Sequence, residues 1–190
     1  MANVLFISEQ RLKSITAIHD NVEPNDLMPY VVQAQDIYIQ EILGTTFFNS
    51  LKDAIVNSTL TTAETTLIDD YLAPTTANYA LYLGLPTLNY KIKNKAVLVP
   101  TSEESTTTGL DEIRFLRDSI LDTAQFYAQR SIEYLCNNDV EFPDYTNPNI
   151  DDGMLPNKNT QYNAGIFIPS SNWGCGICSE QDCVCNEKYL

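Results

Sequence analysis

The residues whose types and spacing best suit metal binding or redox chemistry are four cysteines close to the C-terminus. Their spacing is Cys175-x2-Cys178-x4-Cys183-x-Cys185. Four thiolates can hold zinc tetrahedrally, and the spacer of the first pair is a common ligand spacing. The second pair is separated by one residue, and the residues between the pairs leave almost no room for a fold. We therefore expect free thiols that can oxidise outside the cell, with zinc binding as the alternative.

Other residues that could support catalysis do not form a recognisable pattern. His19 is the only histidine and falls in a predicted turn, where no third group holds it as a base for a nucleophile. The pairs Glu103-Glu104 and Asp151-Asp152 fall in predicted loops, where solvated charge is the default interpretation. The seven glycines never approach a nucleotide-binding spacing. We expect no enzyme activity, no cofactor and no metal site.

The composition is acidic and sufficiently apolar for a folded core. The chain has 25 acidic and 11 basic residues, a formal charge of −14, and 44% apolar residues. Such a surface repels nucleic acid and anionic membranes. No apolar run approaches the ~18 residues of a membrane span, and the N-terminus lacks the basic region of a secretion signal. Since no cysteine framework crosses the body of the chain, we expect synthesis in a reducing cytoplasm.

The elements that must position any site are predicted to be helices, and the clearest covers residues 26–44. Asp26 is expected to cap its first turn, and Gly44 is expected to end it. Gln35 is predicted on the polar side. An apolar stripe recurs every three or four residues, which predicts the central member of a bundle: Leu27, Val31, Ala34, Tyr38 and Ile42, widened by Tyr30 and Ile37.

Similar patterns predict other helices on both sides of this one. They comprise a short helix capped by Ser8, a helix over residues 45–57, a third starting with a capping box at Thr61 and Glu64, and a fourth starting at Pro74 and closed by Gly84 and Pro86.

The pattern changes at residues 89–109, which are predicted to form a strand insertion. Short alternating segments around Ile92 and Val97 indicate two strands or one hairpin that turns at Asn94-Lys95. The longest helix is expected from Leu110 to about Asn137. Its predicted buried side is Ile113, Leu116, Ile120, Ala124, Tyr127 and Leu135.

The domain organisation predicted from these patterns has two parts. Residues 1–138 form a helical bundle, and residues 139–190 form an extended arm rich in proline and asparagine. The arm carries isolated apolar residues that either anchor a partner or fold back on the bundle: Ile166, Phe167, Ile168 and Trp173.

Three stretches of this sequence resemble a known family when they are taken in order. They are PYVVQAQDIYIQEILGTTFFNSL, YALYLGLPTLNYKIKNKAVLV and FLRDSILDTAQFYAQRSIEYL, which lie within residues 4–142. The combination resembles the head-to-tail connector, or neck ring, proteins of tailed phages, most like those of crAss-like phages. That family commonly has a glycine in the strand turn, where this chain has Lys95-Ala96. The cysteine-bearing arm lies outside the resemblance.

The resemblance implies a structural protein of the virion. It implies a homo-oligomeric ring of about twelve copies that joins the portal to tail or other neck proteins. Double-stranded DNA would pass through the channel without specific binding, and an acidic lining suits that task. The protein would be made and assembled in the host cytoplasm, with no membrane association.

Two other interpretations remain open from the sequence. A soluble acidic binding module, such as a DNA-mimicking inhibitor, would share the charge but would need neither a ring nor an arm. A small metal-dependent regulator would be organised around Cys175, Cys178, Cys183 and Cys185.

Overall fold

The fold is mainly α-helical, as predicted. The computed structural model describes residues 4–19, 21–89, 91–93, 96–98, 110–149, 151 and 153–158. The secondary structure in chain order is α1 (Glu9–Ile15), α2 (Pro24–Ala34), the π-helical turn η1 (Gln35–Ile39), α3 (Gln40–Leu43), α4 (Thr45–Asn57), α5 (Thr62–Thr66), the π-helical turn η2 (Leu67–Leu72), α6 (Ala73–Asn89), β1 (Lys91–Lys93), β2 (Ala96–Leu98), α7 (Leu110–Asn137) and α8 (Pro143–Thr146).

The helix predicted over residues 26–44 is present, but it starts earlier and its register changes partway. Glu23 occupies the N-cap position, and Asp26 lies in the first turn instead of capping it. The segments α2, η1 and α3 follow one another without a break, and Gly44 ends the run with a φ of 74°. This positive φ explains why the terminating residue is glycine.

Because of the π-helical turn η1, the buried residues of this helix differ from those predicted from the sequence. A π-turn holds more residues than an α-turn, so the stripe after it shifts around the helix. Ile39 is fully buried, whereas Ile37, predicted to be part of the stripe, is 50% exposed. Gln35, predicted to be polar-facing, is buried, where its Oε1 accepts from Phe6 N at 2.9 Å and its Nε2 donates to Val4 O at 3.1 Å.

The third and fourth predicted helices form one continuous run of α5, η2 and α6. The capping box at Thr61 and Glu64 is confirmed at its start. Pro74 does not begin a separate helix: it is the second residue of α6, which continues without a break from η2, where the register of backbone hydrogen bonds changes. Gly84 and Pro86 also lie inside α6 instead of closing it. A side chain at position 84 would meet the ring of Tyr30 at 3.0 Å, so the glycine lets that ring pack on α6.

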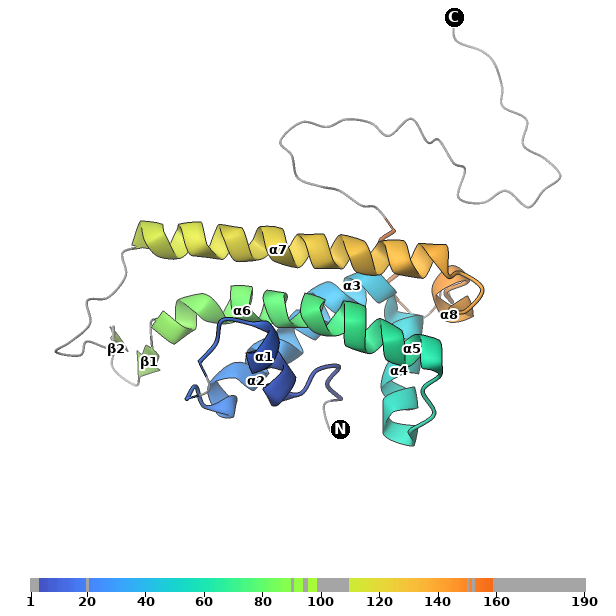
Figure 1. Ribbon diagram of the computed structural model, residues 1–190, viewed down its shortest axis with the longest axis horizontal. Coiled ribbons are helices and arrows are strands. Elements are labelled where there is room, and N and C mark those ends of the chain that lie inside the picture. The colour runs from blue at the N-terminus through green and yellow to red at the C-terminus, as the bar shows by residue number, and fades with distance from the viewer. Residues whose placement is uncertain are drawn as a thin grey trace, which may run out of the picture. The chain divides into compact units, whose positions relative to one another are not determined.

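Helix α6, and not the predicted helix over residues 26–44, is the central member of the bundle. It packs against α1, α2 and α7, and α7 runs alongside it (Figure 1). The Oγ1 of Thr75 and the Oγ of Ser131 lie 3.0 Å apart between α6 and α7, and both residues are fully buried. This buried pair is hydrogen-bonded and therefore fixes how the two helices lie against each other.

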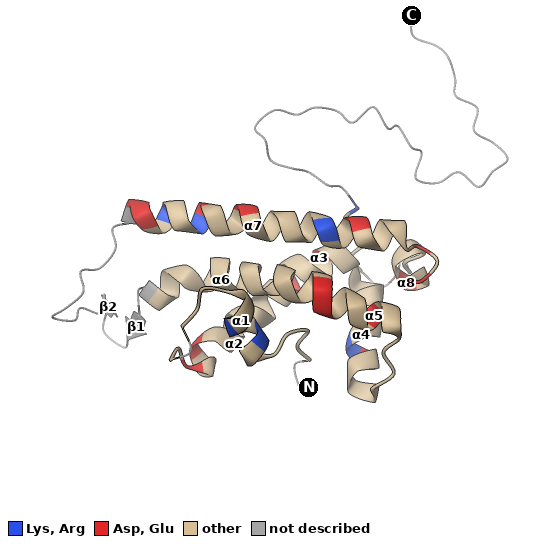
Figure 2. Ribbon diagram, viewed as in Figure 1, with Lys and Arg blue, Asp and Glu red and all other residues tan. Residues whose placement is uncertain are grey.

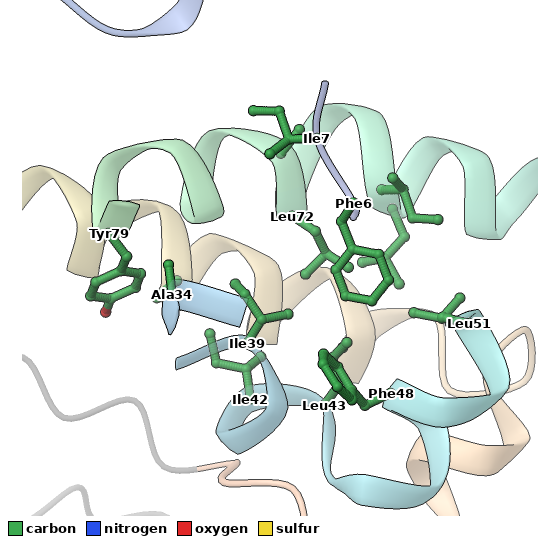
Figure 3. Close-up of a cluster of buried hydrophobic side chains, with 14 of the residues drawn as sticks. Phe6, Ile7, Ala34, Ile39, Ile42, Leu43, Phe48, Leu51, Leu72 and Tyr79 are labelled. Atoms are coloured by element: carbon green, nitrogen blue, oxygen red, sulfur yellow. The ribbon is translucent and has the colours of Figure 1, made fainter. Parts of the chain in front are cut away.

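The core lies between α6 and the segments that pack against it. Figure 3 shows Phe6 from the N-terminal segment beside Leu72, Ile39 and Phe48. The rings of Phe6 and Phe48 pack edge to face at 5.5 Å. Side chains that are 0% exposed include Val31, Ile39, Leu43, Leu51, Leu67, Leu72 and Leu135.

The folded body continues past the predicted boundary after residue 138, and this corrects the predicted domain division. Phe142 and Tyr145 are each 1% exposed. The ring centroid of Phe142 lies 5.6 Å from that of Phe47 and 5.9 Å from that of Tyr134. One compact unit spans Met1–Thr160, and the remainder, Gln161–Leu190, lies outside the described residues. Phe142 and Tyr145, on either side of Pro143, are therefore core residues and not part of an arm.

The strands β1 and β2 occupy the middle of the predicted insertion. They pair antiparallel, with Lys91 opposite Leu98, Ile92 opposite Val97 and Lys93 opposite Ala96. Their connection at residues 94–95 and the segment 99–109 lie outside the described residues.

Candidate interaction surfaces

The residues predicted to be chemically relevant do not come together in the part of the chain that the structure describes. His19 is exposed, and its Nδ1 accepts from Asn21 N at 3.2 Å within a local turn. Asp151 is exposed. Among the described residues, no three histidine, cysteine or acidic side chains are grouped as metal ligands. The pair Glu103-Glu104, Asp152 and the cysteines at 175, 178, 183 and 185 lie outside the described residues.

Cys136 is exposed near the end of α7. Its Sγ lies 4.0 Å from the phenolic oxygen of Tyr145. Burial and the nearby Cys136 raise the pKa of Tyr145 above its ordinary value, so this phenol stays protonated at neutral pH. The contact links α8 to the end of α7.

An aromatic cluster lies where η1, α6 and α7 meet. The rings of Tyr38 and Tyr79 stack with centroids 3.8 Å apart, and the guanidinium carbon of Arg117 lies 4.2 Å from the ring centroid of Tyr82. Burial, together with the neighbouring Tyr38 and Glu41, raises the pKa of Tyr79 to about 12. The stacked rings and the cation over the ring connect the three segments. The cluster is therefore a structural junction of the bundle.

A second junction lies where α3 turns into α4. Thr45 N donates to Met154 O at 2.8 Å, and Asn157 N donates to Glu41 O at 2.9 Å. A side chain at Gly44 would meet Pro156 at 2.7 Å. The segment 153–157 thus lies directly on this corner and satisfies backbone groups that helix ends leave open. We name this arrangement the α3–α4 corner.

The outward side of α7 carries large apolar side chains. Phe115 is 78% exposed and Phe126 is 58% exposed, while Asp118 and Asp122 between them are exposed too. Leu116, predicted to be buried, is 49% exposed. We name the set Phe115, Asp118, Asp122 and Phe126 the outer face of α7. Figure 2 shows how acidic and basic residues alternate along this helix.

The hairpin β1–β2 is the other candidate surface. Within the described residues, the sheet has only these two strands. Each strand therefore has an outer edge that no described strand of the same chain pairs with. Open edges of this kind can accept a strand or pack on another surface.

Sequence reasoning missed the outer face of α7 because the helical period assigned Leu116 to the buried side and did not single out Phe115 or Phe126. A signal was present in the spacing, because Phe115 and Phe126 are eleven residues apart, which is about three helical turns. It also missed the α3–α4 corner, because contacts between residues 41–45 and 153–157 leave no periodic trace.

The family assignment rests on the central part of the chain. Residues 39–151 match the family of unknown function DUF6712, and this chain belongs to that family. The matched region begins in η1 and includes the hairpin, α7 and α8. It extends past residue 138, in agreement with the burial of Phe142 and Tyr145. Searches of curated proteins and of solved structures gave no match to the chain. Over the described residues, no helix combines the length and apolarity that a membrane span requires.

Proposed function

We propose that this chain is a structural head-to-tail connector ring protein of a tailed-phage virion. In this proposal, several copies form a ring that joins the portal to tail or other neck proteins. The resemblance of residues 4–142 to connector proteins of crAss-like phages suggests the assignment, and the mainly helical bundle is compatible with it. The cytoplasm of the host is then the place of synthesis, and the virion is the final location.

The observation that best supports the proposal is the two-stranded hairpin inserted between α6 and α7. A two-stranded hairpin is marginally stable in water unless another surface covers one of its faces. Its sequence is also apolar for a surface loop, with Ile92, Val97 and Leu98 in six described positions. A neighbouring copy in a ring supplies such a surface. This repeated contact would propagate around the ring.

The charge of the chain agrees with a channel for DNA. A formal charge of −14 per copy disfavours binding to a polyanion that must slide through the assembly. The same charge also suits a DNA-mimicking inhibitor. Such an inhibitor would bind a basic groove as a single copy and would not be incorporated in virions.

The test replaces Val97 and Leu98 together with Asp in the phage genome that encodes the chain. The expected result is a protein that melts like the unchanged one but is missing from purified particles by mass spectrometry. The control replaces two exposed apolar residues outside the hairpin, Val56 (66% exposed) and Val140 (88% exposed), with Asp. The control protein should be incorporated normally.

Two results would contradict the proposal. If the unchanged chain is absent from purified particles, the chain is not a connector. If the Val97→Asp/Leu98→Asp protein unfolds as an isolated chain, the hairpin belongs to the internal core and does not serve the assembly. The inhibitor alternative is tested by size-exclusion chromatography with light scattering in the presence of a basic partner protein. An inhibitor would form a complex that contains one copy of this chain.

A further inference from the structure

The outward side of α7 has the residue spacing of a coiled-coil seam. Phe115, Ser119, Asp122 and Phe126 follow one another at steps of four, three and four residues, and all four are exposed. Such steps keep side chains on one side of a helix, where they can pack against a second helix. We name these four residues the α7 seam. Its two phenylalanines are eleven residues apart and therefore ~16 Å apart along the helix axis.

The α7 seam exposes large aromatic surfaces. Phe115 is 78% exposed and Phe126 is 58% exposed, whereas Ala124 and Leu135 on the opposite side of the helix are fully buried. That opposite side packs against α6, which runs alongside α7 (Figure 1). Large apolar side chains that are grouped on one face and bordered by polar residues are typical of a protein interaction site.

The seam is symmetric about its own midpoint. The phenylalanines lie at its two ends, Ser119 and Asp122 lie between them, and both pairs are centred on the point midway between residues 120 and 121. A two-fold axis through this point would place Phe115 of each copy against Phe126 of the other. It would also place Ser119 against Asp122. The serine hydroxyl could then donate a charge-assisted hydrogen bond to the carboxylate, and each of these contacts would occur twice.

The charges beside the seam follow the same symmetry. Glu112 and Arg130 are eighteen residues apart, which is five helical turns, so they lie on one flank of the seam. Their midpoint lies within one residue of the midpoint of the seam, and both residues are exposed. The two-fold axis would therefore place Glu112 of each copy near Arg130 of the other. Opposite charges paired in this way favour this register over others.

We propose that the α7 seam binds the α7 seam of a second copy of this chain, with the two helices antiparallel about a two-fold axis. The second copy is the occupant because the seam and its charged flank complement themselves under this symmetry. A contact of about three helical turns buries less than the ~800 Å² per partner of a standard stable interface, so the dimer is weak and reversible. A two-fold contact closes on itself and does not propagate around a ring, so the inference is independent of the connector function.

Asp118 opposes this contact and provides a way to strengthen it. It lies three residues after Phe115, on the flank of the seam opposite to Glu112 and Arg130, and it is exposed. The two-fold axis places it beside Asp122 of the second copy, within one residue along the helix. The two carboxylates repel each other and weaken the dimer. A positive charge at position 118 should therefore tighten it.

The first test identifies the contact by photo-crosslinking. The residue p-benzoylphenylalanine is placed at position 115 of the full chain, and equal amounts of ¹⁴N- and ¹⁵N-labelled protein are mixed under reducing conditions, irradiated and digested for mass spectrometry. We expect position 115 to capture the peptide that contains residue 126, with both isotopes in one product. The two positions are ~16 Å apart within one chain, too far for a link inside one copy. The same residue at exposed position 56 is the control and should not capture that peptide.

The second test measures the dissociation constant of the dimer by sedimentation equilibrium of the full chain under reducing conditions. Phe115→Ser/Phe126→Ser should raise the constant by about tenfold or more, because both aromatic contacts are lost. Val56→Ser/Val140→Ser removes two exposed apolar side chains outside the seam and should leave the constant unchanged. Circular dichroism during heating should show that both double variants melt like the unchanged chain.

The third test uses the charge at position 118. Asp118→Lys should lower the dissociation constant by about three- to tenfold, because a repulsive pair becomes an attractive one. Asp118→Lys/Asp122→Lys should lose this gain, because like charges then meet again. Asp139→Lys makes the same change of net charge at an exposed position outside α7 and should not reproduce the gain.

Four results would overturn the inference. They are a chain that remains monomeric at the highest concentrations, a dimer that Phe115→Ser/Phe126→Ser leaves intact, a crosslink from position 115 to a peptide without residue 126, and an equal gain from Asp118→Lys and Asp139→Lys. The presence or absence of the chain in purified particles tests the connector function and leaves this contact unaffected.

Discussion

The α3–α4 corner and the α6–α7 insertion both connect helices, but they differ in how their backbone hydrogen-bonding groups are paired. At the corner, Gly44 turns the chain, and segment 153–157 covers it with backbone hydrogen bonds from Thr45 and Asn157. At the insertion, β1 and β2 pair only with each other among the described residues. The corner is completed by the chain itself, whereas each strand of the insertion has an edge that no described strand of the chain pairs with. We infer that the corner serves folding and the insertion serves assembly.

The largest effect expected from this comparison concerns the end of the folded body. Truncation after residue 160 should preserve cooperative helical melting, whereas truncation after residue 138 should abolish it. The shorter chain loses Phe142 and Tyr145, both 1% exposed. Loss of one large buried aromatic residue costs about 3–5 kcal/mol, and the stability of a whole domain is about 5–15 kcal/mol. Circular dichroism during heating is the measurement, and equal melting of both truncations would contradict the assignment of the core.

The next effect concerns Gly44 in the α3–α4 corner. Gly44→Ala should lower the free energy of unfolding by about 2–4 kcal/mol, because a φ of 74° strains alanine and its Cβ would approach Pro156 to 2.7 Å. Urea denaturation measures this change. The matched control is Gly84→Ala, which meets only the movable ring of Tyr30 and gains helix propensity, so it should change stability by less than about 1 kcal/mol. Similar losses of unfolding free energy for both variants would show that position 44 has no special requirement for glycine.

The aromatic junction between η1, α6 and α7 should make stability depend on alkaline pH. The pKa of Tyr79 is raised from 10.0 to about 12 in the folded chain, so the neutral phenol stabilises the fold. This stability is fully present below pH 10 and decreases as the pH rises towards 12. Tyr79→Phe removes the titrating group and should flatten the decrease in that interval. Denaturation midpoints measured from pH 9 to 12 should show this difference, and parallel curves for the two proteins would contradict it.

The smallest effect on folding is expected on the outer face of α7. Phe115→Ser should change the free energy of unfolding by less than about 0.5 kcal/mol, because surface substitutions away from packed groups have little effect. Leu135→Ser on the same helix should cost several kcal/mol, because that side chain is fully buried. Urea denaturation of both variants measures the contrast. A large loss for Phe115→Ser would mean that Phe115 contributes to the core of its own chain.

The sequence predicted local features better than contacts between distant segments. The Ser8 and Thr61 caps and the range of α7 follow from short patterns, and all are present in the structure. The burial of Gln35 and the exposure of Ile37 could not be predicted, because the π-turn shifts the helical period on which the pattern depends. The continuous run through Pro74 was missed for the same reason.

Candidate surfaces were less predictable than helices. The hairpin was visible as a change of period, but the outer face of α7 requires knowing which side of the helix packs against α6. The α3–α4 corner depends on contacts between residues more than one hundred positions apart, such as Asn149 N to Thr46 Oγ1. Such contacts depend on the tertiary arrangement and not on local sequence. The extended arm was predicted to begin too early because buried Phe142 and Tyr145 lie on either side of Pro143 and carry no helical period.

The most direct test of the proposed assembly role is a cryo-electron microscopy reconstruction of the neck of phage virions produced by the genome that carries this chain. The account predicts a ring of this helical bundle between portal and tail, in which the insertion between α6 and α7 contacts a neighbouring copy. A neck without this chain would contradict the connector function. A ring in which each hairpin packs only on its own bundle would contradict the division between a corner that serves folding and an insertion that serves assembly.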